Sequence, residues 1–284
     1  MEQGDFALSD QEFDRVKARL YAEAGIALSD SKRTLVVSRL SRLLRLLNLG
    51  SFTAYIDYLE RQADAAARQE FINALTTNLT RFWREEHHFE HLTGYVGQLM
   101  KARPTASEQR LRIWSAGCST GQEAYTIALS LLEAYPELKR WDFRVLATDI
   151  DTRVVAEGAA GVYAATELAG LTPARARLFE PYGDGRIRVP AQVRDLVQFK
   201  VLNLVNGPWP MRGPFDAIFC RNVAIYFDKP TQTEMFSRLG ELLAPGAFLY
   251  IGHSENPGSG ASRFRGVGKT VYQLTAPARA RNAA

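Results

Sequence analysis

One segment limits the possible folds of this chain more than any other: residues 114–129, which read WSAGCSTGQEAYTIAL. Apolar residues lead into it and predict the end of a buried strand: Leu111, Ile113, Trp114 and Ala116. Gly117 and Gly121 then bracket a short polar turn, and a helix is expected from Gln122. A strand, a glycine turn and a helix in this order let a ligand lie against backbone at the carboxyl edge of a parallel sheet.

The spacing of the two glycines narrows the kind of ligand. It is Gly-x-x-x-Gly rather than the dinucleotide pattern Gly-x-Gly-x-x-Gly, and the turn has no lysine to hold a phosphate. Glycine suits both positions because a Cβ would block close approach and resist a positive φ. The pattern alone leaves two interpretations open, a ligand-binding turn and a plain tight connection.

Length and composition fit a globular enzyme with one large and one small domain. The chain has 284 residues, of which 46% are hydrophobic, and it lacks the run of about 18 apolar residues that a transmembrane helix needs. The first ten residues, MEQGDFALSD, lack the basic and apolar regions of a secretory signal. Two cysteines, Cys118 and Cys220, cannot form a disulfide framework, so we expect a reducing cytoplasm.

A metal site is not expected. His87 and His91 have the i, i+4 spacing that could hold zinc on a helix. No acidic or cysteine partner accompanies them in a metal-binding pattern.

The basic residues concentrate in residues 32–48, KRTLVVSRLSRLLRLLN, which contain no acid. One face of the expected helix is apolar: Leu35, Val36, Leu40, Leu43, Leu44 and Leu47. Arg39, Arg42 and Arg45 lie on the other side. This side is either a solvated face or a docking surface for an acidic partner, such as a protein helix or a nucleic acid.

Residues 1–75 are expected to form a small all-helical domain. Its helices are predicted over 10–24, 31–47, 51–61 and 65–75, with N-caps at Ser9, Ser31 and Ser51 and helix stops at Gly25 and Gly50. Residues 76–110 form a connecting region, polar and aromatic as far as residue 100.

From residue 111 to 284 strands and helices alternate, which predicts a mainly parallel sheet covered by helices on both faces. Strands are expected over 112–116, 143–148, 197–201, 215–220 and 247–252, with a C-terminal pair within 264–274. Helices are expected over 122–135, 152–157 and 231–243. The alternation breaks at about 161–198, which predicts an insertion with a short helix over 168–179, a turn at 182–185 and edge strands over 185–189 and 196–199.

Polar residues follow two of these strands. Asp149 ends the strand about 30 residues after the glycine turn, where a carboxylate can accept hydrogen bonds from both ribose hydroxyls of a nucleoside. The alternative role at this point, a helix N-cap, suits Asp151 better. Arg221 and Asn222 follow the buried strand 215–220 and should face the same site.

Taken together, these segments resemble the CheR-type chemoreceptor methyltransferases. The matching stretches are TTNLTRFWRE (76–85), WSAGCSTGQEAYTIAL (114–129), ATDID (147–151), NL (203–204), FCRNVAIYFD (219–228) and GHSE (252–255). They occur in the family's order, and the resemblance covers about residues 10–275. It implies a class I methyltransferase fold, a Rossmann-like α/β domain with a small antiparallel β insertion behind an all-α domain. It also implies methyl transfer from S-adenosylmethionine to receptor glutamates, which leaves S-adenosylhomocysteine.

The resemblance also implies residue roles. Asn78, Thr80 and Arg84 would contact the methionine end and the substrate side of the cofactor, and Arg84 would orient the substrate carboxylate. The remaining cofactor contacts would be Gly117, Glu123, Asp149 on the ribose, Asn203 and Leu204 around the adenine, and Arg221 and Asn222. Tyr226 is a weaker candidate, since it could equally be a core aromatic. Two positions depart from the common pattern: Gln122 stands where many members have Glu, and Trp83 where many have Phe.

The expected chemistry needs no general base, because a glutamate with a pKa of about 4.3 is already ionised near pH 7. Alignment and desolvation would supply most of the catalysis. Two other classes stay open: a nucleic-acid methyltransferase, although no Asn-Pro-Pro-Tyr-like motif occurs, and a non-catalytic scaffold that binds cofactor. The expected partner is the cytoplasmic helical region of the receptors, with no membrane insertion. The short turn PYGDG (181–185) predicts that the enzyme does not depend on a receptor-tethered C-terminal pentapeptide.

Overall fold

The computed structural model describes residues 6–258 and 263–275. Residues 1–5, part of the segment in which the sequence predicts no secretory signal, lie outside the described residues. None of the described helices combines the length and apolarity that a bilayer crossing needs.

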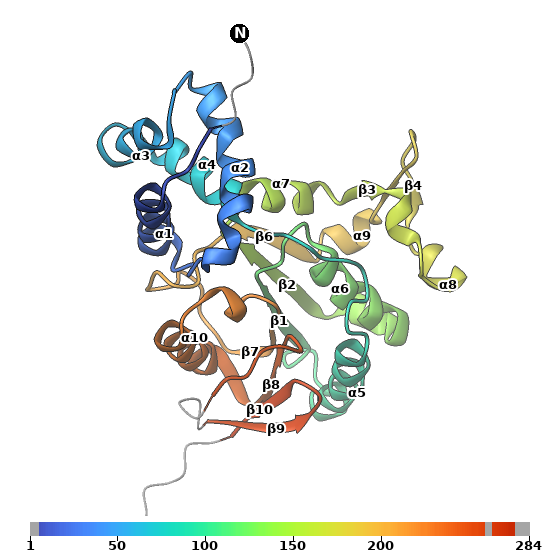
Figure 1. The fold of residues 1–284 in the computed structure, drawn as a ribbon. Coiled ribbons are helices and arrows are strands. Elements are labelled where there is room, and N and C mark those ends of the chain that lie inside the picture. The colour runs from blue at the N-terminus through green and yellow to red at the C-terminus, as the bar shows by residue number, and fades with distance from the viewer. Residues whose placement is uncertain (1–5, 259–262, 276–284) are drawn as a thin grey trace, which may run out of the picture.

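The N-terminal helical unit consists of α1 (Asp10–Ala24), the 3₁₀ turn η1 (Asp30–Lys32), α2 (Arg33–Leu46), α3 (Phe52–Arg61) and α4 (Ala65–Leu75). Its helices bury a core of their own, to which Phe13, Leu40, Tyr55 and Phe71 contribute. In Figure 1 this blue unit lies above and beside one edge of the central sheet. The unit is therefore positioned to cover that edge.

Helix ends in this unit follow the expected capping in three places. Ser9 caps α1 in a capping box with Glu12, Ser51 caps α3, and Gly25 ends α1 with a φ of 68°. The two other expectations were wrong. Ser31 lies inside η1 and bonds to Ser29 Oγ, so α2 begins after it. The helix stop expected at Gly50 comes earlier: α2 ends at Leu46, and Asn48 takes the left-handed conformation with a φ of 53°, which asparagine tolerates.

The central sheet has seven strands in the order β6-β2-β1-β7-β8-β10-β9. These are β1 (Arg110–Ala116), β2 (Asp142–Asp149), β6 (Val197–Val201), β7 (Phe215–Cys220), β8 (Leu243–Ile251), β9 (Phe264–Gly268) and β10 (Val271–Leu274). The five strands from β6 to β8 are parallel, and β10 and β9 join antiparallel. The carboxyl ends of the parallel strands therefore share one edge, which faces the helical unit.

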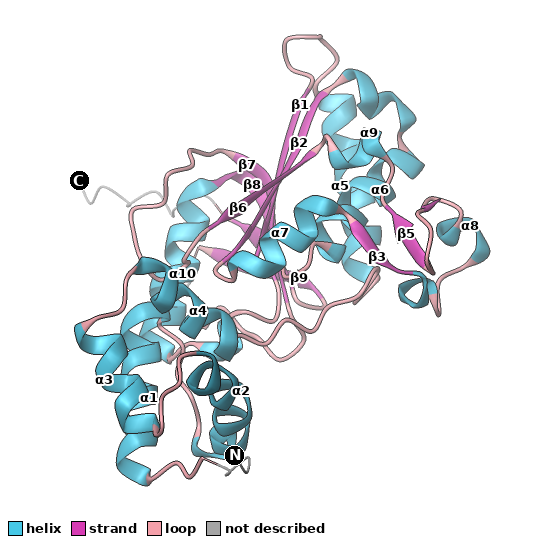
Figure 2. Cartoon of the chain, turned by 90° about the horizontal axis from the view of Figure 1, so that it is seen from above, coloured by secondary structure: helices cyan, strands magenta, loops and turns pink. Residues whose placement is uncertain are grey.

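Helices cover both faces of this sheet, as Figure 2 shows. The longer ones are α5 (His87–Ala102), α6 (Gln122–Ala134), α7 (Thr152–Ala160) and α10 (Lys229–Leu242), with the 3₁₀ turns η2 (Pro136–Arg140) and η4 (Ala224–Tyr226). Along β7, Phe219 packs into the core under α5 and α6, whereas Ile218 packs into the core under α10. Cys118 belongs to the first core and Cys220 to the second, and both thiols are buried.

We expected residues 76–100 to be a connection between the two domains. Instead, most of them belong to helix α5. Phe89, Leu92 and Val96 recur at helical spacing and are buried against the sheet domain. The irregular part of the connection is shorter than expected and ends before α5.

The insertion forms a separate antiparallel sheet, β3 (Val162–Ala164), β5 (Arg186–Arg188) and β4 (Glu180–Pro181), in that order. It also carries η3 (Ala165–Leu168), α8 (Pro173–Ala176) and α9 (Ala191–Arg194). The helix expected over 168–179 is reduced to α8, which Pro173 begins and Thr172 caps. Residues 196–199 do not pair with the insertion, because β6 is bonded to β2 at the edge of the main sheet.

Candidate active site

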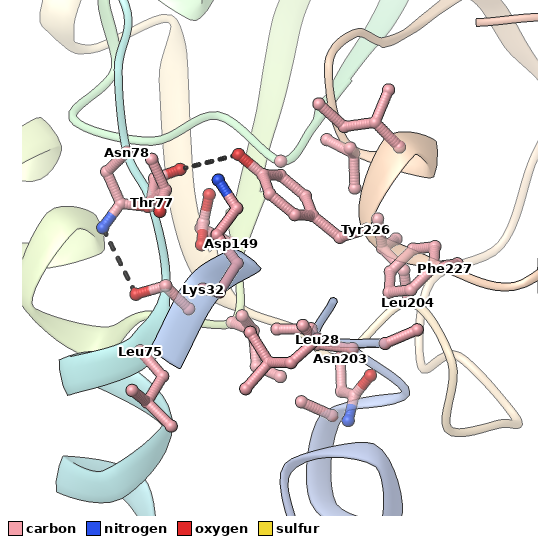
Figure 3. A pocket seen from close by; sticks show the side chains of 18 of the residues that line it. Leu28, Lys32, Leu75, Thr77, Asn78, Asp149, Asn203, Leu204, Tyr226 and Phe227 are labelled. Carbon is pink, nitrogen blue, oxygen red and sulfur yellow. Dashed lines mark hydrogen bonds between the residues drawn. The ribbon is translucent and has the colours of Figure 1, made fainter. Parts of the chain in front are cut away.

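A cavity of about 380 Å³, here called the larger cavity, lies at the carboxyl ends of the parallel strands. One wall comes from the strand ends and the other from the helical unit, chiefly residues 24–35. Figure 3 shows Asp149 and Tyr226 on the first side and Leu28 and Lys32 on the second. The contribution of residues 24–35 was not foreseen, because nothing in that stretch suggests a ligand site.

The glycine turn fits closely against its surroundings. Gly117 has a φ of 78°, and a Cβ on it would lie 2.2 Å from Val223 Cγ2. Gly121 has a φ of 93° and would place a Cβ 2.8 Å from Phe199. Of the two interpretations left open for this turn, the structure favours the ligand site, because Gly117 lines the larger cavity.

Asp149, at the end of β2, is a partly buried carboxylate that lines the larger cavity. Its Oδ2 accepts the N–H of Ser119 at 2.8 Å, and its Oδ1 accepts the N–H of Asp151 at 3.0 Å. Burial raises its pKa, and these backbone N–H groups oppose the rise. Each oxygen keeps a further acceptor site, so the carboxylate can still bind two hydroxyl groups.

Asp151 has the structural role expected of it. It caps α7 by accepting the N–H of Arg153 at 2.9 Å. Its other oxygen accepts Asn78 Nδ2 at 2.9 Å and Thr76 Oγ1 at 2.7 Å. Asp151 therefore ties the connecting segment to the strand end, which leaves Asp149 for the cavity.

A smaller cavity of about 190 Å³ adjoins the first. The two cavities share six lining residues: Thr77, Asn78, Gly117, Asp149, Ile225 and Tyr226. Thr80 and Arg84 line only the smaller one, and Arg84 Nη1 donates to the carbonyl of Leu79 at 2.9 Å. The structure thus brings Asn78, Thr80 and Arg84 together as expected.

Glu123 and Arg221 form a buried ion pair beside the smaller cavity. Arg221 Nη1 lies 3.0 Å from Glu123 Oε2, and Ser115 Oγ donates to Glu123 Oε1 at 2.7 Å. Burial raises the pKa of Glu123, and Arg221 opposes that rise. Arg221 Nη2 donates to the carbonyl of Arg84, so most of this guanidinium is engaged within the protein.

Glu255 organises the loop after β7, a role that the sequence did not reveal. Its carboxylate accepts the N–H groups of Asn222 and Val223 at 2.8 Å, of Ile225 at 3.3 Å and of Gly252 at 2.6 Å. These bonds hold Asn222 with a φ of 59° at the wall of the smaller cavity. Only its place in the GHSE segment marked Glu255 in the sequence.

Tyr226 faces the junction of the two cavities (Figure 3). Its hydroxyl donates to the carbonyl of Thr77 at 3.5 Å, a long contact that leaves it free to turn to another acceptor. Burial raises its pKa, so the group stays a hydrogen-bond donor near pH 7.

Asn203 and Leu204 line the far end of the larger cavity. Asn203 Nδ2 donates to the carbonyl of Glu23 at 2.9 Å, and its Oδ1 accepts the N–H of Val205. The N–H of Ala27 likewise donates to the carbonyl of Tyr226 at 2.8 Å. These bonds join the helical unit to the sheet domain directly around the cavity.

The three arginines of α2 that were expected to form a row, Arg39, Arg42 and Arg45, lie outside both cavities and are not equivalent. Arg42 and Arg45 are exposed, and Arg45 lies over the ring of Phe6. Arg39 instead donates to the carbonyls of Ala74 and Thr76. The exposed row expected from the sequence therefore contains two of the three.

The histidines of α5 point to separate partners. His87 contacts the carbonyl of Lys269 at 3.1 Å, and His91 contacts the hydroxyl of Tyr250 at 3.0 Å. Within the described part of the chain, no group of three or more potential ligands converges on a metal position.

These features fit S-adenosylmethionine. The larger cavity has the volume of a cofactor site, and Gly117 of the glycine turn lines it. Asp149, which lines both cavities, supplies an acceptor for hydroxyl groups, and Glu123, which lines the smaller cavity, supplies a carboxylate for a cationic amine.

Two family models match the chain. Residues 11–76 match the CheR methyltransferase all-alpha domain, and residues 78–273 match the CheR methyltransferase SAM binding domain. S-adenosylmethionine is therefore the cofactor of this chain.

Similar proteins carry the same family's names. The chain is 45% identical to "Chemotaxis protein methyltransferase 2" of Pseudomonas aeruginosa, with 94% of each chain covered. It is 44% identical to "Probable chemotaxis protein methyltransferase" of Rhizobium etli, over 90% of this chain and 97% of the relative. It is 43% identical to "Chemotaxis protein methyltransferase" of Escherichia coli, over 95% and 92%. The chain belongs to the CheR family of S-adenosylmethionine-dependent chemotaxis methyltransferases.

Proposed function

We propose that this enzyme transfers the methyl group of S-adenosylmethionine to glutamate side chains in the cytoplasmic helical region of chemotaxis receptors. One observation carries the proposal: the larger cavity shares six lining residues with a smaller one, which Arg84 and Tyr226 also line. A cavity of about 190 Å³ has room for a side chain but not for a helix. The acceptor is therefore a side chain that reaches in while its backbone stays outside.

We propose residue roles that are compatible with this arrangement. Asp149 holds the ribose hydroxyls, Asn203 and Leu204 border the adenine, and Glu123 with Asn78 and Thr80 borders the methionine end. Gly117 gives the backbone its close approach, and Asn222 shapes the wall after β7. Arg221 acts indirectly, because its guanidinium donates hydrogen bonds to Glu123 and to the Arg84 carbonyl.

The chemistry needs binding and orientation more than proton transfer. When bound, S-adenosylmethionine supplies a methyl group that passes to a carboxylate oxygen while the carbon–sulfur bond breaks and its electron pair stays on sulfur. Arg84 orients the attacking carboxylate, and the Tyr226 hydroxyl donates to it. The buried Cys118 thiol does not compete as a nucleophile, because burial raises its pKa.

The mouth of the smaller cavity suits a helical protein. Leu79 is 81% exposed and Ile225 is 47% exposed, and both line this cavity. They can pack against apolar side chains next to the acceptor glutamate. Arg42 and Arg45 of α2 would meet acidic residues farther along the receptor.

The proposed division of labour places docking in residues 1–75, part of the cofactor site in residues 76–110, and catalysis in residues 111–284 with the insertion at about 161–198. The enzyme would work in the cytoplasm, and it would not act on nucleic acid. We also propose that it does not require a receptor-tethered pentapeptide.

The test is a transfer assay with labelled S-adenosylmethionine and purified receptor cytoplasmic fragments, with RNA in parallel. We expect label on the receptor that mild alkali releases as methanol, which identifies a carboxyl methyl ester. A receptor fragment whose acceptor glutamates are changed to alanine is the control and should stay unlabelled. Label on RNA, or alkali-stable label on protein, would contradict the proposal, and cofactor binding without any transfer would indicate a scaffold.

A further inference from the structure

The turn that carries Arg84 is fixed from several sides. The N–H of Trp83 donates to Thr126 Oγ1 at 3.2 Å, and Trp83 Nε1 donates to Ser130 Oγ at 3.1 Å, so the turn is attached to α6. Trp83 and Glu85 both have a positive φ, of 51° and 58°. Non-glycine residues hold such conformations only where neighbouring contacts impose them.

Glu85 lies behind this turn and faces the buried guanidinium of Arg221. The Glu85 side chain is 8% exposed and the Arg221 side chain 2%, and Glu85 Oε2 lies 3.3 Å from Arg221 Nη2. This oxygen makes no hydrogen bond to any described residue, so its charge is balanced by cations nearby. The same Nη2 donates to the carbonyl of Arg84.

The other groups near Glu85 contribute less charge. His88 Nδ1 is 3.6 Å away, but burial and the Arg221 charge lower the pKa of His88 to about 2, so it is neutral. His253 Nε2 is farther, at 3.9 Å, and its side chain is 58% exposed. Arg221 is therefore the charge that Glu85 meets in the interior.

We propose that Glu85 is a positioning residue for methyl transfer: it holds Arg221 against the Arg84 carbonyl and so fixes where the Arg84 side chain meets the acceptor carboxylate. Arg221 is shared between two carboxylates with different roles. Glu123 joins it to the cofactor side, and Glu85 joins it to the substrate side. The inference rests on the proposed role of Arg84 in binding the acceptor.

Glu85→Gln keeps the shape of the side chain and removes its charge, which makes it the direct test. We expect kcat for receptor methylation to fall about 10- to 100-fold, because small displacements of an orienting group cost that much. The dissociation constant for S-adenosylmethionine, measured by calorimetry, should change less than about twofold, because Glu123 still holds Arg221. Glu86→Gln is the matched control: Glu86 is the next residue, is exposed and pairs with Arg175, so kcat should stay unchanged.

A double-mutant cycle separates positioning from a general structural role. In an Arg84→Ala background, Glu85→Gln should cost almost nothing more, because the group it positions is already gone. Glu85→Asp, which keeps the charge, should recover part of kcat. Full activity of Glu85→Gln, or the same loss with and without Arg84, would overturn the inference. An inactive wild-type enzyme would instead refute the proposed function.

Discussion

The carboxyl ends of the parallel strands and helix α2 both carry charged residues, but the environments of these residues are opposite. At these strand ends Arg221 and Glu255 are buried and Asp149 is partly buried, and each has several partners within the protein. On α2, Arg42 and Arg45 are exposed, and neither forms an ion pair with a described residue. The first arrangement fixes geometry before a ligand arrives, and the second leaves side chains free to adapt to a partner.

This difference predicts how each region responds to substitution. Removing a buried charge leaves its partners without hydrogen bonds in a low-dielectric interior, which costs stability or affinity directly. Removing an exposed charge changes a screened, long-range attraction and leaves the fold intact.

Glu255→Ala should have the largest effect. Four backbone N–H groups lose their acceptor, so we expect the free energy of unfolding to fall by about 3 kcal/mol or more. Chemical denaturation measures this, with Glu234→Ala on the exposed face of α10 as the control. Equal stability of the two variants would mean that the loop after β7 does not depend on this carboxylate.

Asp149→Ala should come next and act on the ligand. Two ribose hydroxyls lose a charged acceptor, so the affinity for S-adenosylmethionine should fall by about 1–3 kcal/mol. Calorimetry on the folded variant gives the number, and Glu157→Ala, an exposed acid on α7, should bind like the wild type. Unchanged affinity would refute the ribose assignment and with it the idea of a preformed pocket.

The strand ends that line the cavities could be predicted from the sequence better than the wall that residues 24–35 form opposite them. Strand ends and glycine turns are local signals, so β1 with Gly117 and β2 with Asp149 could be placed from patterns alone. Arg221 was expected to face the site, but its bond to the Arg84 carbonyl joins residues 137 positions apart, and no local pattern records that.

The cavity wall that residues 24–35 form could not be predicted from the sequence, for a similar reason. Its hydrogen bond between Ala27 and Tyr226 uses backbone groups, so the side chains give no sign of it. The same holds for Glu255, whose four partners are backbone N–H groups. In α2 the periodicity placed the arginines on one side, yet Arg39 turns to the carbonyls at the end of α4, which is a tertiary contact.

Charge reversal at Arg42 and Arg45 tests the adaptable region. We expect the double variant to raise the Michaelis constant for receptor about five- to tenfold at low salt, since exposed charge pairs contribute up to about 1 kcal/mol each. Only the wild type should lose affinity steeply as salt rises, and cofactor affinity should be the same in both. Arg39→Glu is the contrasting variant, because its contacts to α4 predict lost stability instead. Normal methylation by the double variant at low salt would make α2 an ordinary solvated surface.

The smallest expected effect concerns the insertion, which offers a sheet edge but little to bind. A peptide that adds a strand needs a row of free backbone groups on an edge strand. Here β4 at one edge has two residues, Glu180 and Pro181, and the proline has no N–H to donate. The turn that follows is short, with Gly183 and Gly185 at positive φ. We therefore expect removal of a receptor's C-terminal pentapeptide to change kcat/KM less than about twofold, because under the proposed function the receptor docks through α2 and the cavity mouth instead. Titration of C-terminal receptor pentapeptides checks this directly. A dissociation constant in the low micromolar range would show that the insertion is a second preformed site, and the contrast between a fixed cofactor edge and an adaptable docking surface would no longer hold.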